Sequence, residues 1–280
     1  MELGHLLFTI FSAFFGLAVG SFLNVCIYRI PKGTFFTEKH SYCPKCGQPL
    51  KWYDMVPVFS WIFLGGKCRN CKEKISARYP IVESLNAVLW TLSAYFIGLN
   101  ANAFIYDALF SALIVMTFID IDTKEIPNGI VVFIIILSIP LFFTAKDVVW
   151  WHRLVGAVVI SVPLYVIALV TGGIGGGDIK LYFALGLVLG LYPTLVSAFI
   201  AIVSAGLIGG ALLLTKKVRK GYELPLGPFI ALGAVVTVFA GTPIIDGIKN
   251  LFGIYYLYII RRRDAKRSKF RRHPVGERLY

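Results

Sequence analysis

Residues 103–120 read AFIYDALFSALIVMTFID, a mostly apolar run close to the length needed to cross a bilayer as a helix. Outward from this run, seven further stretches have the same character. They cover residues 6–28, 80–99, 127–145, 153–171, 179–192, 194–214 and 226–245. The sequence therefore predicts an all-α polytopic membrane protein with about eight transmembrane helices.

The composition excludes the soluble classes of protein. Of the 280 residues, 57% are hydrophobic and 15% are charged, and the mean hydropathy is +0.74. Soluble domains contain roughly 45–50% apolar and about 25% charged residues. A disordered chain needs low hydrophobicity, and a disulfide-rich domain needs more cysteines than the five present here.

The basic residues predict the side of the membrane on which each loop lies. The net charge is +13, but residues 29–78 hold ten Lys and Arg against three Asp and Glu, and residues 261–280 hold nine against two. With the N-terminus outside, the inner segments carry 16 basic residues and the outer ones three. This is the positive-inside bias, so we expect residues 29–78 in the cytoplasm.

The C-terminal end leaves two arrangements open. Residues 241–260 are apolar enough for a ninth crossing, although Asp246 and Lys249 interrupt them. That crossing would bring the basic tail to the anionic lipid of the cytoplasmic face. Without it, the run would form an interfacial helix on the outer face. We expect the inside tail, because it keeps the positive-inside bias.

Residues 29–78 contain two Cys-x-x-Cys units, Cys43 with Cys46 and Cys68 with Cys71. Each unit places two thiolates on one side of a metal, and two units complete the tetrahedral set that structural zinc prefers. Two disulfides or four unrelated thiols are the alternatives, but a cytoplasmic segment is in a reducing compartment. We therefore expect a structural zinc site, which an insert with little core would need in order to fold.

Two carboxylates lie at the inner end of the run that contains residues 103–120. On a helix, Asp120 and Asp122 point about 200° apart, so only one of them can face the bundle interior. Asp120 lies one turn deeper than Lys124, so we expect Asp120 to face inward and Asp122 to be an interfacial charge. Ionisable groups within membrane helices are functional candidates by default.

A glycine-rich stretch, residues 172–177, leads into Asp178 at the start of the sixth predicted helix. Chain parity places Asp178 on the same side of the membrane as Asp120. Glycines permit unusual dihedrals and close backbone approach, so an extended peptide could lie against this segment. A phosphate cradle is a rival interpretation, but the sequence lacks both nucleotide-loop patterns. In a third interpretation, both aspartates are only interfacial helix caps.

Five motifs together resemble those of the bacterial prepilin peptidases, the type IV leader peptidase/N-methyltransferases. They occur in the family's order over roughly residues 10–240, and only the tail after about residue 245 departs from many relatives. The motifs are the segment from Gly16 through Gly20 and Asn24 to Pro31, the two Cys-x-x-Cys units, Arg78 to Glu83, Ile119-Asp120 through Pro127-Asn128, and Gly175-Gly176-Gly177-Asp178-Ile179-Lys180.

The resemblance implies an intramembrane aspartyl protease whose catalytic residues are Asp120 and Asp178. The family's glycine-x-glycine-aspartate motif falls on Gly175, Gly176, Gly177 and Asp178, and the three glycines would bind substrate. The implied activity is cleavage of prepilin or pseudopilin leaders at the cytoplasmic face of the bacterial inner membrane. The resemblance also implies that the new N-terminus is then methylated with S-adenosylmethionine.

The sequence gives little indication of the residues responsible for methyl transfer, because it contains no visible nucleotide-binding fingerprint. Glu83 is the candidate for binding the new amino group. In the alternative interpretation, Glu83 is only an interfacial carboxylate near Arg78. We expect prepilins or pseudopilins and membrane lipid as partners, and no nucleic acid.

The expected organisation has four parts. They are the first transmembrane helix (1–28), a cytoplasmic zinc-knuckle segment associated with methyl transfer (29–79), the transmembrane aspartyl protease body (80–245), and an apolar stretch with a basic tail (246–280).

Two rival functions compete with this hypothesis. A proton-coupled transporter would use Asp120 and Asp178 as a relay, but it predicts polar groups at the midplane of several spans. A non-catalytic scaffold would use the zinc segment for docking, but it gives no reason for the glycines before Asp178.

Overall fold

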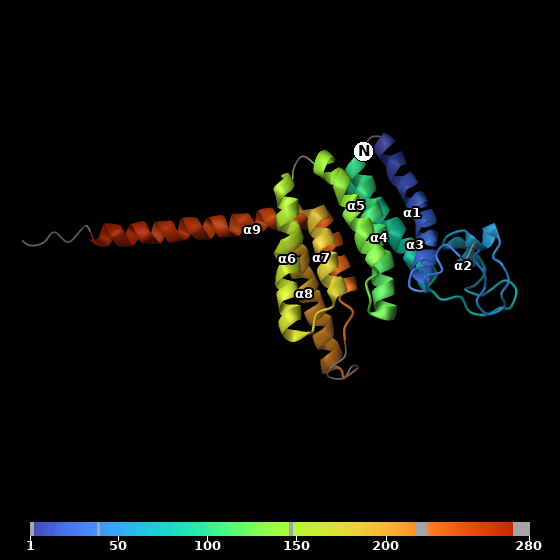
Figure 1. The fold of residues 1–280 in the computed structure, drawn as a ribbon. Coiled ribbons are helices and arrows are strands. Elements are labelled where there is room, and N and C mark those ends of the chain that lie inside the picture. The colour runs from blue at the N-terminus through green and yellow to red at the C-terminus, as the bar shows by residue number, and fades with distance from the viewer. Residues whose placement is uncertain (1–2, 38–39, 146–147, 217–222, 271–280) are drawn as a thin grey trace, which may run out of the picture.

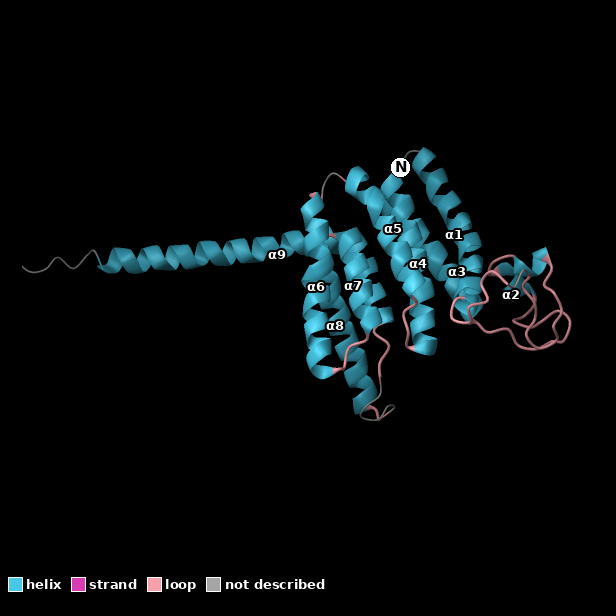
Figure 2. Cartoon of the chain, viewed as in Figure 1, coloured by secondary structure: helices cyan, strands magenta, loops and turns pink. Residues whose placement is uncertain are grey.

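The structure, a computed structural model, describes residues 3–37, 40–145, 148–216 and 223–270. In this part of the chain the helices form a bundle, with a looped insert at one end and no assigned strand (Figures 1 and 2). The prediction of an all-α protein is confirmed.

Each of the eight predicted runs forms a helix. The helices are α1 (Leu3–Arg29), α3 (Arg78–Phe96), α4 (Ala101–Thr123), α5 (Asn128–Thr144), α6 (Trp150–Thr171), α7 (Gly176–Leu189), α8 (Leu191–Leu214) and α9 (Gly227–Phe270). Helices α1, α4, α6 and α8 and the Gly227–Leu251 part of α9 are long and apolar enough to be candidate membrane spans, and α5 is a shorter apolar helix. The polytopic character is therefore supported by five candidate spans rather than by eight.

The break between α7 and α8 lies at Gly190, just before the boundary expected at residues 191–193. Gly190 has φ +84° and ψ 177°, a conformation that glycine adopts without steric strain. Pro193 does not break a helix here, because it lies in the first turn of α8, where no intrahelical N–H donor is needed.

The last helix differs from the expected ninth crossing. α9 continues without a break through residues 241–260 and projects away from the bundle (Figure 1). Within the described residues, 241–260 do not form a separate crossing helix, because α9 runs through them and no turn reverses the chain there. Residues 271–280 of the basic tail lie outside the part of the chain that the structure describes.

Small residues let α1 and α3 pack closely. A Cβ atom at Gly16 would stand 2.9 Å from the Cα of Ala87, and one at Gly20 would stand 2.7 Å from the Cα of Glu83. The Asn86 side-chain amide donates a 2.7 Å hydrogen bond to the Gly16 carbonyl. This close approach is typical of membrane helix pairs, and it joins the two helices that flank the insert.

Helix α4 is central, since it packs against α1, α3, α5 and α9. Its Leu109, Phe110 and Met116 side chains are fully buried. The C-terminal end of α4 and the N-terminal ends of α5, α7 and α9 all lie at the end of the bundle that carries the insert (Figure 1). Residues from distant parts of the sequence therefore meet at this end.

Candidate active site

Asp120 and Asp122 have different surroundings, as the helical geometry predicts. The Asp120 side chain is buried, and its Oδ2 atom accepts a 2.8 Å hydrogen bond from the backbone N–H of Gly227. Asp122 is exposed and pairs with the Arg78 guanidinium at 2.6 Å. Arg78 also donates to the carbonyl of Phe118 at 2.9 Å, so it ties α3 to the end of α4.

Asp178 lies in the first turn of α7 and is half-buried. Its carboxylate is close enough to that of Asp120 for the two to repel each other electrostatically. The structure therefore brings together two carboxylates that are far apart in the sequence, at the same end of the bundle and within the helical body. Two acidic groups that lie close together can share one proton.

The glycines before Asp178 act through close approach rather than through unusual dihedrals. A Cβ atom at Gly177 would stand 2.9 Å from the Cβ of Ile126, so this glycine lets the segment after α4 pack against α7. Positive φ occurs at Gly172, at +64°, and at none of residues 175–177. Gly175 and Gly176 are exposed, and a Cβ atom at Gly176 would meet nothing within 4 Å.

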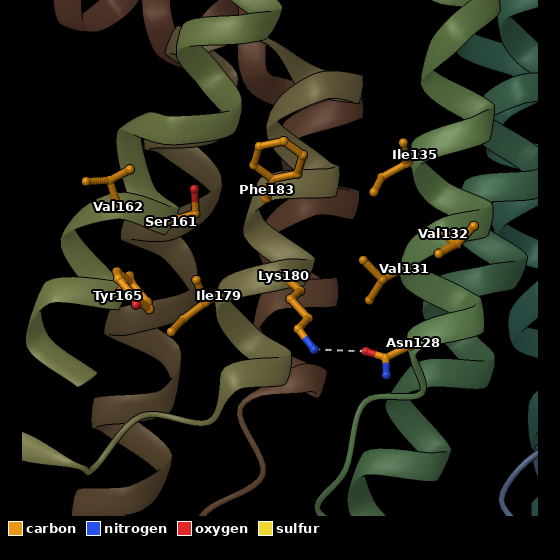
Figure 3. A pocket seen from close by; sticks show the side chains of 10 residues that line it. All are labelled: Asn128, Val131, Val132, Ile135, Ser161, Val162, Tyr165, Ile179, Lys180 and Phe183. Atoms are coloured by element: carbon orange, nitrogen blue, oxygen red, sulfur yellow. Dashed lines mark hydrogen bonds between the residues drawn. The ribbon is translucent and has the colours of Figure 1, made fainter. Parts of the chain in front are cut away.

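A groove of about 550 Å³ lies between α5 and α6, with α7 as its floor (Figure 3). Ile179 and Lys180, the two residues after Asp178 in the sequence, are part of its lining. Its walls are mostly apolar, and the Lys180 ammonium donates a 3.1 Å hydrogen bond to the Asn128 side chain at one end. The lining includes Val131, Val132, Ile135, Val162, Ile179 and Phe183.

The insert brings its four predicted metal ligands together. The sulfur atoms of Cys43, Cys46, Cys68 and Cys71 all lie within 4.8 Å of one another, and none is in a disulfide. The Cys43 and Cys71 sulfur atoms are 3.8 Å apart. A zinc ion with Zn–S bonds of about 2.3 Å in a tetrahedron requires sulfur atoms about 3.8 Å apart, so the cluster fits zinc.

Each pair of cysteines lies on a small turn of the same design. The N–H of Cys43 donates to the carbonyl of Gln48, and that of Cys68 donates to Glu73. A backbone hydrogen bond from Gln48 lowers the pKa of the Cys46 thiol, which favours the thiolate that a metal binds. Although a backbone hydrogen bond from Glu73 opposes it, desolvation and the neighbouring sulfur atoms raise the pKa of Cys71 to about 11.

Glu83 is buried near the start of α3, where it contacts the insert. Its Oε2 atom accepts a 2.7 Å hydrogen bond from the backbone N–H of Val58. Val58 precedes α2 (Phe59–Phe63) and has φ +60°, which a β-branched residue rarely adopts. Glu83 therefore anchors the insert to α3, whereas Arg78 pairs with Asp122 instead.

A second cavity, of about 770 Å³, lies between the inner end of α1, the insert and the start of α3. Both aromatic and carboxylate side chains line it. They include Tyr28, Trp61, Tyr79, Asp54, Glu73 and Glu83. Because Tyr79 follows Arg78, which contacts Asp122, this cavity begins close to the end of α4 that carries Asp120.

Sequence reasoning did not identify Gly227 or Val58 as site residues. Both residues act through their backbone N–H groups, and such a contact cannot be predicted from the type of side chain. The only sequence signal for Gly227 is its place in Leu226-Gly227-Pro228, just before the eighth apolar run on the predicted inner side.

Comparisons with known proteins agree with the geometry. Residues 14–97 match the Bacterial Peptidase A24 N-terminal domain, and residues 108–210 match the Type IV leader peptidase family. The chain is 34% identical over 234 residues to the prepilin leader peptidase/N-methyltransferase of Bacillus subtilis, covering 83% of this chain and 94% of the relative.

Two further relatives carry the same name. That of Neisseria gonorrhoeae is 34% identical over 79% of this chain and 86% of its own length, and that of Vibrio cholerae is 32% identical over 80% and 93%. These three relatives are named as peptidases and methyltransferases, which lends no support to the transporter hypothesis. No solved structure matches the chain.

Proposed function

Because the chain belongs to the type IV leader peptidase family, we propose that it cleaves the leaders of prepilins or pseudopilins and then methylates the new amino terminus. The observation that carries the proposal is the pairing of Asp120 with Asp178 at one end of the bundle. We assign these two residues as the catalytic groups, with Gly175, Gly176 and Gly177 beside the path of the substrate.

The protease step follows from two adjacent carboxylates. Like charges close together do not both ionise readily, so the pair holds one proton between them. The ionised carboxylate removes a proton from a water molecule, whose oxygen attacks the scissile carbonyl while the protonated carboxyl polarises it. When the C–N bond breaks, the leaving nitrogen takes up a proton, the leader leaves with a carboxylate and the mature chain with an amine.

The groove between α5 and α6 suits the part of the substrate that follows the cleavage site. A leader peptidase substrate of this family carries a basic leader followed by an apolar helix. The groove is apolar along the helices, and Lys180 and Asn128 lie at one end of it. Lys180 follows Asp178 by two residues on α7. An apolar helix in this groove would stay at membrane depth while its N-terminal junction reached the aspartates.

The cavity between α1, α3 and the insert fits S-adenosylmethionine. Its volume is within the usual range for ligand cavities, about 300–1,000 Å³. Its aromatic rings suit a planar adenine, and its carboxylates, with five Lys and Arg side chains beside them, suit the charged amino-acid end of the cofactor. Bound there, the cofactor would supply an electrophilic methyl group.

Glu83 would orient the amino terminus that receives this methyl group. One of its oxygens is already bonded to Val58, and a carboxylate has further lone pairs that can accept an N–H. The four cysteines would hold zinc as a structural ion, because four thiolates leave no open position for water. By keeping the insert folded, the metal would hold the insert in place beside the cavity.

The apolar helices and the family indicate a multi-pass protein of the inner membrane. We place the insert and the aspartate pair at its cytoplasmic face, as the distribution of basic residues predicts.

The decisive experiment is mass spectrometry of a prepilin incubated with purified protein, with and without S-adenosylmethionine. We expect loss of the leader in both samples and an added methyl group only with the cofactor. An intact prepilin in both samples would contradict the protease proposal, and cleavage without methylation would contradict only the second activity.

A further inference from the structure

The hydrogen bond from Gly227 to Asp120 distinguishes the two carboxylates. Gly227 is the first residue of α9, where backbone N–H groups have no acceptor within the helix. Its N–H is directed to Asp120 Oδ2 at 2.8 Å, in a buried environment. The bond joins positions 107 residues apart, so the bundle packing alone brings the two together.

A side chain at this position would collide with its neighbours. A Cβ atom at Gly227 would stand 2.7 Å from Asp120 Oδ2 and 2.7 Å from the Met116 sulfur. Both neighbours are buried residues of α4. A larger residue must therefore push back the Asp120 carboxylate or move the start of α9, and either shift disturbs the hydrogen bond.

Asp178 has no equivalent donor in the described part of the chain. Among the residues that the structure describes, none donates a hydrogen bond to its carboxylate. Asp178 lies in the first turn of α7, where the helix dipole favours negative charge. A direct hydrogen bond to a charged oxygen is stronger than this diffuse effect, so Asp120 has the better-stabilised anion.

Other charged groups near Asp120 do not reverse this difference. Lys124, one turn further along α4, pairs with Glu223 at 3.5 Å. Arg78, on α3, pairs with Asp122. The group that interacts with Asp120 from α7 is Asp178 itself, whose own charge would favour keeping one proton on the pair.

We propose that the Gly227 amide orients Asp120 and stabilises its ionised form, so that Asp120 activates the water and Asp178 carries the proton that polarises the substrate carbonyl. This inference rests on the proposed protease function. Gly227 is a positioning residue, because it acts through Asp120 and not on the substrate.

The test is the Gly227→Ala variant, with Gly247→Ala as its matched control. Gly247 lies on the same helix, and a Cβ atom there would meet nothing within 4 Å. For Gly227→Ala we expect kcat of leader cleavage to fall at least about tenfold with KM little changed. The acid limb of kcat/KM should move to higher pH by about one unit or more, because the ionised form of the base has lost its donor.

Two further measurements separate positioning from folding. Methylation of an already cleaved substrate should proceed as in the wild type, because the cavity near α1 does not involve Gly227. The melting temperature of Gly227→Ala should stay close to that of Gly247→Ala. A large fall in melting temperature together with loss of both activities would show that Gly227 only supports folding, and would overturn the inference.

Failure of this inference differs from failure of the proposed function. Wild-type protein that does not cleave a prepilin contradicts the function itself. Suppose instead that the wild type cleaves, and that Gly227→Ala either cleaves equally well or keeps the acid limb of the wild type. The proposed role of Gly227 would then be wrong, while the proposed catalytic role of the aspartate pair would be unaffected.

Discussion

At the scale of single residues, two positions on α4 separate a buried acid from a surface ion pair. Asp120 faces the interior, where Gly227 contacts it, while Asp122 faces Arg78. The 100° advance per residue of a helix produces this difference. The choice of Asp120 as the inward group therefore followed from local geometry, whereas its catalytic role stays a prediction.

We expect Asp120→Asn and Asp178→Asn each to lower leader cleavage by at least about a hundredfold, because neither amide can exchange the proton that the mechanism requires. Gel-shift assays of prepilin cleavage measure this effect. Asp122→Asn is the matched control and should keep most of the activity, since it removes only a half-exposed ion pair. Wild-type cleavage by a folded Asp178→Asn protein would rule out the aspartate pair.

Glu83 gives a residue-scale prediction for the second activity. Glu83→Gln keeps an oxygen that accepts the Val58 N–H but removes the charge, so methylation should fall while cleavage and thermal stability change little. Glu83→Ala leaves that buried N–H without an acceptor, which costs about 1–3 kcal/mol. Mass spectrometry and thermal unfolding of both variants test this distinction. Normal methylation by Glu83→Gln would make Glu83 only an anchor of the insert.

At the scale of elements, the two cysteine turns share a backbone design but differ at the residue that follows the second cysteine. The position four residues after the first cysteine is Gly47 with φ +68° in one turn and Lys72 with φ +61° in the other. Glycine adopts positive φ without strain, and a side chain there is unfavourable. The second turn is therefore the more strained of the two.

Lys72→Gly should stabilise the insert by up to about 1 kcal/mol by removing this strain. The insert should then keep zinc at higher chelator concentrations, as measured by metal release. Lys74→Gly is the control, because Lys74 has no positive φ and belongs to the bridge with Lys67. Equal zinc retention in wild type and Lys72→Gly would contradict the prediction.

At the scale of the whole molecule, the zinc insert and the aspartate pair lie at the same end of the bundle but belong to different helices. The insert is held by α1 and α3, and the aspartates by α4 and α7. The contact between Arg78 and Asp122 connects the two parts. The two activities should therefore be separable.

Removal of zinc, by chelation or by Cys68→Ser, should abolish methylation and leave most cleavage. The metal stabilises the fold of an insert with little core of its own, whereas the aspartates lie within the helical body. Elemental analysis should show one zinc per chain in the wild type. Equal loss of both activities would show that the insert also supports the protease.

The path of α9 changes the expectation for the basic tail. Its Gly227–Leu251 part is long and apolar enough to cross a bilayer, and the helix then runs away from the bundle (Figure 1). Since α9 starts at the end of the bundle that carries the insert and does not turn back, we expect the tail on the opposite side. Ser268→Cys should then react with an impermeant reagent on intact cells, while Thr37→Cys on the insert should react only after permeabilisation.

The amino-acid sequence was enough to predict the helices, the clustering of the four cysteines and the inward aspartate. Run length, two-residue cysteine spacing and helical periodicity are local properties, and each leaves a pattern in neighbouring residues. Five of the expected spans satisfy the length and apolarity of a membrane helix in the described chain, and the cysteines cluster as their spacing indicates.

The tertiary structure alone revealed the Gly227 donor, the Val58 anchor and the continuous course of α9. The first two contacts use backbone N–H groups, which every residue except proline possesses. The residue type at these positions therefore does not predict the contacts. They depend on how helices distant in sequence pack together. That packing is a property of the whole bundle, and it determines which of two nearly equivalent carboxylates receives a hydrogen bond.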